Sequence, residues 1–367
     1  MENNTDRLAD WEKEEEQSFY EDDFDQQPPP DIVAYNELRS CADLYRMYDR
    51  EILDIAPDFQ RDSVWNPASQ TRFIDSLIKQ LPIPSMCFSL DYKTQKWQVI
   101  DGLQRMTAII RFLGDKDWRL SSLEDIDKRL SGKKVATFRD ESSPHHILYQ
   151  RLENLTLPIT VIRCDYSKKS HLEYLFTIFH RLNTGGTKLN NQEIRNCIFS
   201  GKFNTLLKKE LNENENWRLI NRLNDKEDQR FKHVEIILRF FAFNDDLQTY
   251  KGNLSKFLNE YMRKHRNPDE AFLAKKKKEF EDTADIVSRI LEPDERVGIS
   301  TLEALMIGVS NNIDILKKYN SQELKNLYVK LKEHPSLSPD FLSGGVAKRD
   351  KVEARVEAAR EIFGRQA

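Results

Sequence analysis

Trp97-Gln-Val-Ile-Asp-Gly-Leu-Gln-Arg-Met-Thr-Ala-Ile-Ile110 is the stretch from which the fold of this chain is best predicted. Its first residues are apolar and β-branched, which is typical of a buried strand. Asp101-Gly102 is a turn dipeptide. From Leu103 onward, apolar residues recur at helical spacing. The stretch therefore predicts a strand that passes through a glycine turn into the first turn of a helix.

The start of this helix is also rich in polar groups. Free backbone N–H groups and the positive end of the helix dipole point at one spot, which suits an anion, most often phosphate. Asp101, Gln104 and Arg105 add a carboxylate, an amide and a guanidinium at the same place. The alternative is an ordinary capped turn with a solvated arginine, and Asp101–Arg105 taken alone slightly favour that alternative.

The composition describes a polar chain that is long enough for two domains. Charged residues make up 32% of its 367 residues and hydrophobic residues 39%. No apolar run reaches the ~20 residues that a membrane helix needs, and the N-terminus lacks the apolar region of a signal peptide. We therefore expect a cytoplasmic protein without membrane segments. The four cysteines form no Cys-x-x-Cys pair, so we expect buried reduced thiols rather than disulfides or zinc ligands.

Charge is distributed unevenly along the chain. Residues 1–31 contain twelve acidic and two basic residues, and the whole chain has a formal charge of −4, so the remainder carries +6. A mildly basic body is compatible with binding of nucleic acid or nucleotide. Lys275–Lys278 is the densest basic run and can contact DNA phosphates, although a solvated helix face is the commoner explanation of such a run.

Three segments follow from the patterns along the chain. Residues 1–30 are acidic and end in three prolines, which predicts a disordered tail. Residues 31–165 mix strands and helices, including a hairpin of 86–90 with 96–100 and a strand over 157–164. Residues 166–367 read as helices. The predicted fold class is α+β, with a mixed N-terminal domain and a mostly α-helical C-terminal domain.

Helix starts are marked by local signals. Asn66-Pro67 combines a capping residue with a proline at the first helical position. Asn190 and Glu193 have the spacing of a capping box. Both patterns predict where a helix begins.

Two further polar clusters stand at predicted element ends, like the one at Asp101–Arg105. One contains Gln60-Arg61 and the other runs from His180 to Gly186. Arginine binds phosphate through two parallel hydrogen bonds, and two successive glycines can expose N–H groups as an anion nest. Each cluster alone is explained by a helix cap or a surface ion pair. Together they predict one polar pocket where the two domains meet.

Five motifs occur in order between residues 55 and 200. They are Phe59-Gln-Arg61 with Val64-Trp65, Phe73–Ile78, Pro82-Ile-Pro84, Val99-Ile-Asp-Gly-Leu-Gln-Arg105, and Phe179-His-Arg-Leu-Asn-Thr-Gly-Gly186. With them the chain resembles the N-terminal domain family of GmrSD-type restriction endonucleases, which is grouped with the ParB/sulfiredoxin-like fold. The family signature is Asp-Gly-Gln-Gln-Arg, and this chain has Leu103 in place of the first glutamine.

The resemblance implies a ParB/sulfiredoxin-like nucleotide-binding domain over 31–165, with NTP hydrolysis (an NTPase) tied to DNA restriction and antiviral defence. It implies catalytic roles for Asp101, Gln104 and Arg105, with Asp101 also positioning Mg²⁺. The nucleotide-binding residues that it implies are Gln60, Arg61, Gly102, Arg181, Asn183, Gly185 and Gly186. In this scheme Arg181 and Asn183 close the pocket from the helical domain.

Members of this family often carry an HNH nuclease domain or act with a partner that does. None of the seven histidines stands in an HNH context, so we expect the chain to gate a partner nuclease. Two alternatives stay open. One is a ParB-like DNA-binding module that uses nucleotide as a switch with little catalysis, and the other is a direct metal-dependent DNA nuclease with Asp101 holding the ion. The sequence fixes neither the preferred base nor the formation of a homo-oligomer.

Overall fold

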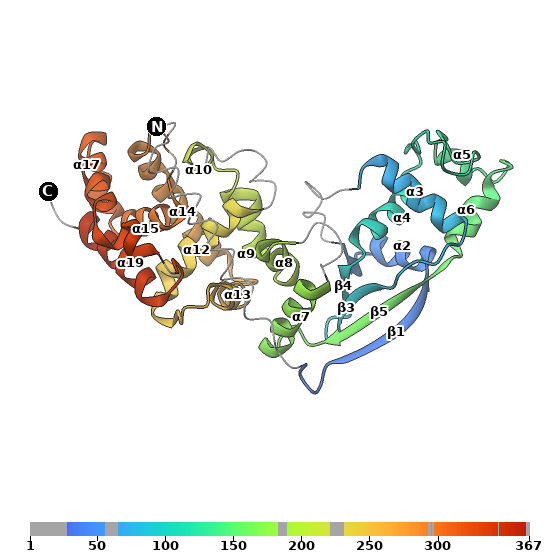
Figure 1. Cartoon of the computed structure of the whole chain (residues 1–367), viewed down its shortest axis with the longest axis horizontal. Helices are drawn as coiled ribbons and strands as arrows, with labels where there is room; N and C mark the ends of the chain where they lie inside the picture. Colours follow the sequence, from blue (N-terminus) through green and yellow to red (C-terminus); the bar gives the residue numbers. More distant parts are fainter. Residues whose placement is uncertain are drawn as a thin grey trace. The chain divides into compact units, whose positions relative to one another are not determined.

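The computed structural model describes residues 28–55, 65–182, 189–220, 231–292, 295, 297–343 and 345–364. These residues fall into two compact units, one within 25–189 and one within 190–367. The first unit combines a five-stranded sheet with helices, and the described part of the second consists of helices and turns (Figure 1). The α+β class predicted from the sequence is confirmed.

The sheet has the strand order β1-β5-β3-β4-β2. Its strands are β1 (Val33–Ser40), β2 (Leu53–Asp54), β3 (Met86–Asp91), β4 (Lys96–Asp101) and β5 (Thr156–Cys164). β1 pairs antiparallel with β5, β3 pairs parallel with β5 and antiparallel with β4, and β2 pairs parallel with β4. The predicted hairpin is β3–β4, and the predicted strand over 157–164 is β5.

The described residues of the sheet unit form six helices. They are α2 (Cys41–Asp49), α3 (Pro67–Ile78), α4 (Leu103–Gly114), α5 (Ala136–Arg139), α6 (His146–Glu153) and α7 (Lys169–Leu182). The Asn66 side chain accepts the N–H of Ser69 at 2.8 Å, and Pro67 occupies the first position of α3, as predicted. The buried side of α4, with Met106 and Ile109, belongs to one core cluster with Val99 of β4 and Ile159 of β5.

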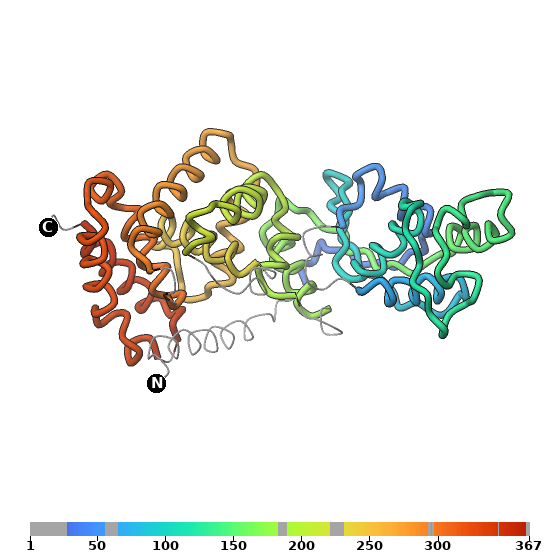
Figure 2. The backbone as a smooth tube through the Cα atoms, turned by 90° about the horizontal axis from the view of Figure 1, so that it is seen from above, coloured from blue at the N-terminus to red at the C-terminus, as the bar shows by residue number. Residues whose placement is uncertain are grey.

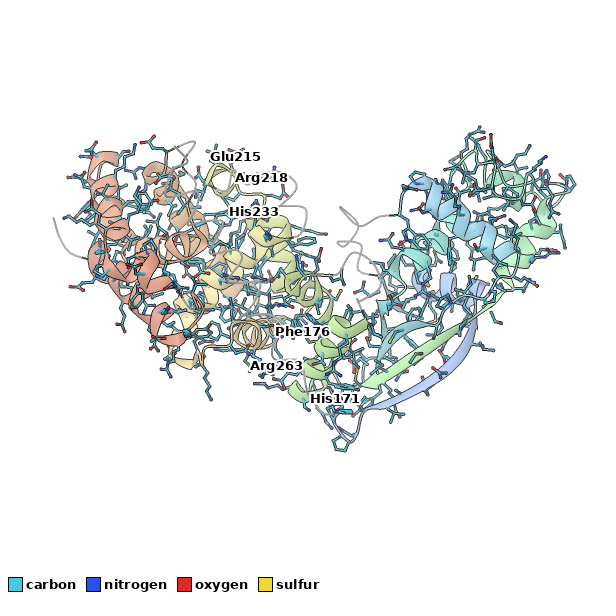
Figure 3. The ribbon with its side chains drawn as sticks, in the orientation of Figure 1. His171, Phe176, Glu215, Arg218, His233 and Arg263 are labelled. Atoms are coloured by element: carbon cyan, nitrogen blue, oxygen red, sulfur yellow. The ribbon has the colours of Figure 1, made fainter. Side chains whose placement is uncertain are left out.

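Helix α7 belongs to the same compact unit as the sheet. The reason is a set of hydrogen bonds around the buried His171 (Figure 3). Its Nδ1 accepts the N–H of Asp165 at 2.9 Å, and its Nε2 lies 2.8 Å from the Asp31 carboxylate. Because Nδ1 accepts, the ring proton is on Nε2 and is donated to Asp31. α7 also contacts β4.

Asp31 gives this cluster a pH dependence. Hydrogen bonds from Lys168 and then from His171 lower the pKa of Asp31 from 3.8 to about 2. A carboxylate with a depressed pKa stabilises the fold above its unfolded pKa, and that stability is lost as the pH falls through the folded value. We expect Asp31→Asn to flatten the fall of the melting temperature between pH 4 and pH 2, measured by circular dichroism. An unchanged slope would show that Asp31 is not coupled to folding.

The described helices of the second unit (green to red in Figure 2) range from 4 residues in α9 to 21 residues in α14. They are α8 (Asn191–Ile198), α9 (Lys202–Thr205), α10 (Glu215–Ile220), α12 (Lys232–Asp246), α13 (Leu254–Lys264), α14 (Glu270–Ile290), α15 (Ile299–Ser310), α16 (Ile313–Leu316), α17 (Ser321–Lys332), α18 (Pro339–Leu342) and α19 (Arg349–Gly364). A π-helical turn spans Leu206–Leu211, and 3₁₀ turns span Leu247–Thr249 and Pro335–Leu337. The predicted capping box is present, since the side chains of Asn190 and Glu193 each accept the other's backbone N–H.

A chain of buried charges joins four helices of the second unit. Arg195 of α8 donates to Glu235 of α12 at 2.8 Å, and Arg239 of α12 bonds both Glu235 and Glu303 of α15. Arg355 of α19 donates to the other oxygen of Glu303 at 2.9 Å. We call Arg195, Glu235, Arg239, Glu303 and Arg355 the charge chain. It holds three positive and two negative groups.

The basic run at Lys275–Lys278 is not a uniform cationic surface. The Lys276 ammonium is buried and lies 2.6 Å from Asp245 and 2.8 Å from Glu279. Lys277 pairs with Glu210 at 2.7 Å. These carboxylates neutralise two of the four lysines, so the structure lends the run no support as a DNA contact. Among the described residues, no helix combines the length and apolar character needed to cross a membrane.

Candidate functional site

The predicted strand, glycine turn and helix are all present. β4 ends at Asp101, Gly102 has φ 99° and ψ 15°, and α4 begins at Leu103. This left-handed conformation favours glycine. A Cβ atom at Gly102 would lie 2.5 Å from Cγ and 2.8 Å from Sδ of Met86, the first residue of the neighbouring strand β3. The backbone angle and the close approach of Met86 both require glycine here.

Helix α4 begins without a side-chain cap. Gly102 occupies the cap position, and its carbonyl accepts the N–H of Met106 at 2.9 Å. The N–H groups of the first turn therefore point out of the helix end, in the direction in which the helix dipole is positive. This end of α4 has the electrostatic character of an anion-binding position.

Arg105 is held beside this helix end and is not a solvated side chain. Its Nη2 lies 2.7 Å from Oδ2 of Asp101, and its Nη1 donates to the carbonyl of Pro84 at 2.5 Å. The Arg105 side chain is 15% exposed, whereas that of Asp101 is 41% exposed. The alternative of a surface arginine is excluded for Arg105. The Asp101 carboxylate, next to Arg105, keeps one side exposed to solvent.

Gln104 has a positioning contact that sequence analysis did not find. Its Oε1 accepts the backbone N–H of Trp65 at 3.0 Å, and the Trp65 ring packs edge-on against Phe73 of α3 with centroids 5.3 Å apart. Gln104 thereby fixes the residues before α3 to the first turn of α4. With Oε1 engaged, the group that Gln104 can offer to a ligand is its amide NH₂, a donor.

Leu103 and Cys87 are apolar neighbours of the site. Leu103, which departs from the family signature, is partly buried against the core of the sheet unit. Cys87 pairs with Asp101 across β3 and β4. Burial, followed by the negative charge of Asp101, raises the pKa of the Cys87 thiol to about 12. The thiol therefore stays protonated at neutral pH and does not act as a nucleophile.

Of the other predicted site residues, Arg181 alone lies in the part of the chain that the structure describes. Gln60, Arg61, Asn183, Gly185 and Gly186 lie outside the described residues. Arg181 is in the last turn of α7, so it belongs to the sheet unit and not to the helical domain from which it was expected to act. The shared pocket stays a prediction.

The donor set around Asp101 suits Mg²⁺ only in part. Within the described residues, no group of three or more His, Cys, Asp or Glu side chains is arranged to hold a metal ion. Mg²⁺ keeps several waters and commonly binds through one or two carboxylates plus the phosphates of a substrate. A single exposed carboxylate beside an anion-binding helix end fits that mode.

Comparison with known proteins agrees with this geometry. Residues 41–200 match the family described as the N-terminal domain of the GmrSD restriction endonuclease. This segment is a GmrSD-type N-terminal domain. The GmrSD-type segment starts at the first residue of α2, contains the whole α4 site and ends just after α8. No curated protein and no solved structure matches the chain. The resemblance drawn from the motifs is confirmed, and the ParB/sulfiredoxin-like fold stays a prediction.

Proposed function

We propose that this chain binds and hydrolyses a nucleoside triphosphate as a component of a DNA restriction and antiviral defence system, and that nucleotide turnover gates a partner nuclease. The observation that carries the proposal is the uncapped start of α4 with the Asp101–Arg105 pair beside it. The GmrSD-type segment supports the assignment to restriction. In this proposal residues 31–165 have a ParB/sulfiredoxin-like nucleotide-binding fold.

The ion pair suggests how Asp101 and Arg105 would act. In the present state they neutralise each other at 2.7 Å. Arg105 exchanges its carboxylate for a phosphate oxygen at the start of α4, where its guanidinium offsets charge that develops during phosphoryl transfer. Asp101 would then be the residue that holds a divalent cation together with the phosphates, and the cation would supply the counter-charge that Arg105 no longer provides. Binding of phosphate and binding of Mg²⁺ are therefore coupled through one pair of side chains.

The three polar side chains of the site have different tasks in this proposal. Because Gln104 Oε1 accepts from Trp65, its NH₂ group is the part that donates to a phosphate oxygen. Asp101 is then the side chain of the motif that can accept a hydrogen bond from an attacking water and orient it, because its carboxylate is partly exposed to solvent. Arg105 stays close to the phosphates through its second contact, the Pro84 carbonyl.

Asp101→Ala and Arg105→Ala are each expected to lower phosphate release by about 100-fold or more, the usual effect of removing a group that stabilises charge in the transition state. The measurement is phosphate released by the pure protein from each of the four NTPs with Mg²⁺, with plain and modified DNA present or absent. Arg129→Ala is the matched control, because the exposed Arg129 pairs with Asp127 away from the site. Full activity in both site variants would contradict the proposal.

The same experiment separates the alternatives. Nucleotide binding without phosphate release supports a ParB-like DNA-binding module that uses nucleotide as a switch. Cleavage of DNA by this chain alone supports a direct metal-dependent nuclease. In the proposed scheme, Asp101→Asn also weakens the dependence of nucleotide binding on Mg²⁺. When Arg105 moves to the phosphate, the asparagine leaves no carboxylate charge that a cation has to neutralise.

A further inference from the structure

The two edges of the sheet differ in length. At one edge β2 is two residues long, and a short edge strand offers little backbone for another chain to pair with. At the other edge β1 is eight residues long, and every one of them pairs with β5 on its inner side (Figure 1). Within the described ranges, the outer side of β1 is the long unpaired edge of this sheet.

β1 also exposes apolar side chains. Val33 is 49% exposed, Tyr35 37% and Leu38 69%, and Leu38 is the most exposed large hydrophobic side chain among the described residues. A long edge strand that shows apolar side chains is a site at which proteins pair with another strand. These observations mark β1 as an interaction surface.

We propose that β1 pairs with β1 of a second copy of this chain, antiparallel and centred on Leu38. A two-fold axis perpendicular to the sheet keeps the helix-covered faces of both copies on the same side. Residues directly opposite each other share a face, so such a dimer pairs odd residues with odd and even with even. Every residue of β1 meets this condition as a centre. We compare the three near the middle of the strand, Asn36, Glu37 and Leu38, because a centre at Tyr35 leaves Arg39 opposite no residue of β1.

Charge selects among the three centres. A centre at Glu37 places two glutamates directly opposite each other, which is destabilising. A centre at Asn36 places Arg39 opposite Val33, without a matching charge. A centre at Leu38 places Glu37 opposite Arg39 of the second copy at two equivalent positions, and Leu38 opposite itself. The Leu38-centred arrangement is the one with complementary charges.

The side chains are already positioned for this arrangement. The Arg39 guanidinium donates to Glu37 within one chain and lies 4.7 Å above the Trp97 ring, on the helix-covered face. Both charged side chains remain partly exposed. In the dimer they form a ring of alternating charges on that face, and the two Leu38 side chains meet on the opposite face. The two five-stranded sheets then become one continuous sheet.

The first test is cross-linking through a cysteine at the symmetry axis. Leu38→Cys is expected to give a disulfide-linked dimer under mild oxidation, because directly opposite Cα atoms lie within the reach of a disulfide. Asn36→Cys is the matched control. It is on the same face, but it is opposite Ser40, so the two copies of residue 36 are about 14 Å apart along the strand. The four natural cysteines are buried and give little background.

The second test measures dimerisation without a cross-link. The strand overlap is short, so we expect a concentration-dependent dimer seen by sedimentation at about 100 micromolar protein. Leu38→Lys places two ammonium groups side by side and should raise the dissociation constant at least ten-fold. Leu81→Lys, at another exposed apolar residue outside β1, should leave it unchanged. A monomeric wild type, equal cross-linking at residues 36 and 38, or a dimer indifferent to Leu38→Lys would overturn the proposal.

Discussion

Gly102→Ala is expected to lower the free energy of unfolding of the sheet unit by about 2–4 kcal/mol. Two effects add. The φ of 99° is unfavourable for any residue with a Cβ. The new methyl group would also lie 2.5 Å from Cγ of Met86, so β3 and the start of α4 would have to separate. Urea unfolding of the full chain, followed by tryptophan fluorescence, measures the loss.

Gly132→Ala is the control that separates these effects. Gly132 also has a positive φ, 67°, but its nearest neighbour would be Oγ of Ser122 at 3.6 Å, an ordinary contact. This variant is expected to lose only the backbone contribution, about 1 kcal/mol. If both variants lose the same stability, the contact with Met86 has no energetic importance, and the close packing of β3 against the glycine turn is not a requirement of the fold.

Glu303→Gln is expected to lower the free energy of unfolding of the helical unit by about 3–5 kcal/mol. Glu303 is buried and bonds Arg239 at 3.1 Å and Arg355 at 2.9 Å. Glutamine has the same shape without the charge, so the variant removes the carboxylate that Arg239 and Arg355 share. Neither guanidinium can lose its proton at accessible pH. Urea unfolding followed by circular dichroism is the measurement.

The same substitution at an exposed ion pair provides the comparison. Glu260 pairs with Arg263 at 2.5 Å, but both side chains are more than a third exposed. Water screens such a pair, and Glu260→Gln is expected to cost at most about 1 kcal/mol. Similar losses of unfolding free energy in the two variants would mean that burial of the charge chain does not determine its contribution to stability.

The parts of the fold that the sequence predicted are those set by neighbours within a few residues. The cap at Asn66, the capping box of Asn190 and Glu193, and the β3–β4 hairpin each involve groups close together in the chain. The position of Asp101 and Arg105 at one helix start belongs with them, although the ion pair that they form was not predicted. Local rules of this kind need no knowledge of the tertiary structure.

The features that the sequence did not predict depend on contacts between residues distant in sequence, or on hydrogen bonds from a side chain to a backbone group. His171 bonds Asp31, 140 residues away, and this contact assigns α7 to the sheet unit. Arg105 and Gln104 bond the carbonyl of Pro84 and the N–H of Trp65, and backbone groups leave no residue-type signal. α8 has a polar sequence, yet all eight of its residues are buried, and the charge of Arg195 is met by Glu235, 40 residues away.

The charge chain restricts how this protein can change in evolution. Each of its carboxylates serves two arginines, so replacing Arg195, Arg239 or Arg355 by an apolar residue still leaves both carboxylates with an arginine. Replacing Glu235 or Glu303 instead removes the carboxylate that Arg195 or Arg355 binds here. Residues joined in this way contribute non-additively to stability. The two carboxylates are therefore the members of the charge chain at which an apolar substitution is tolerated least.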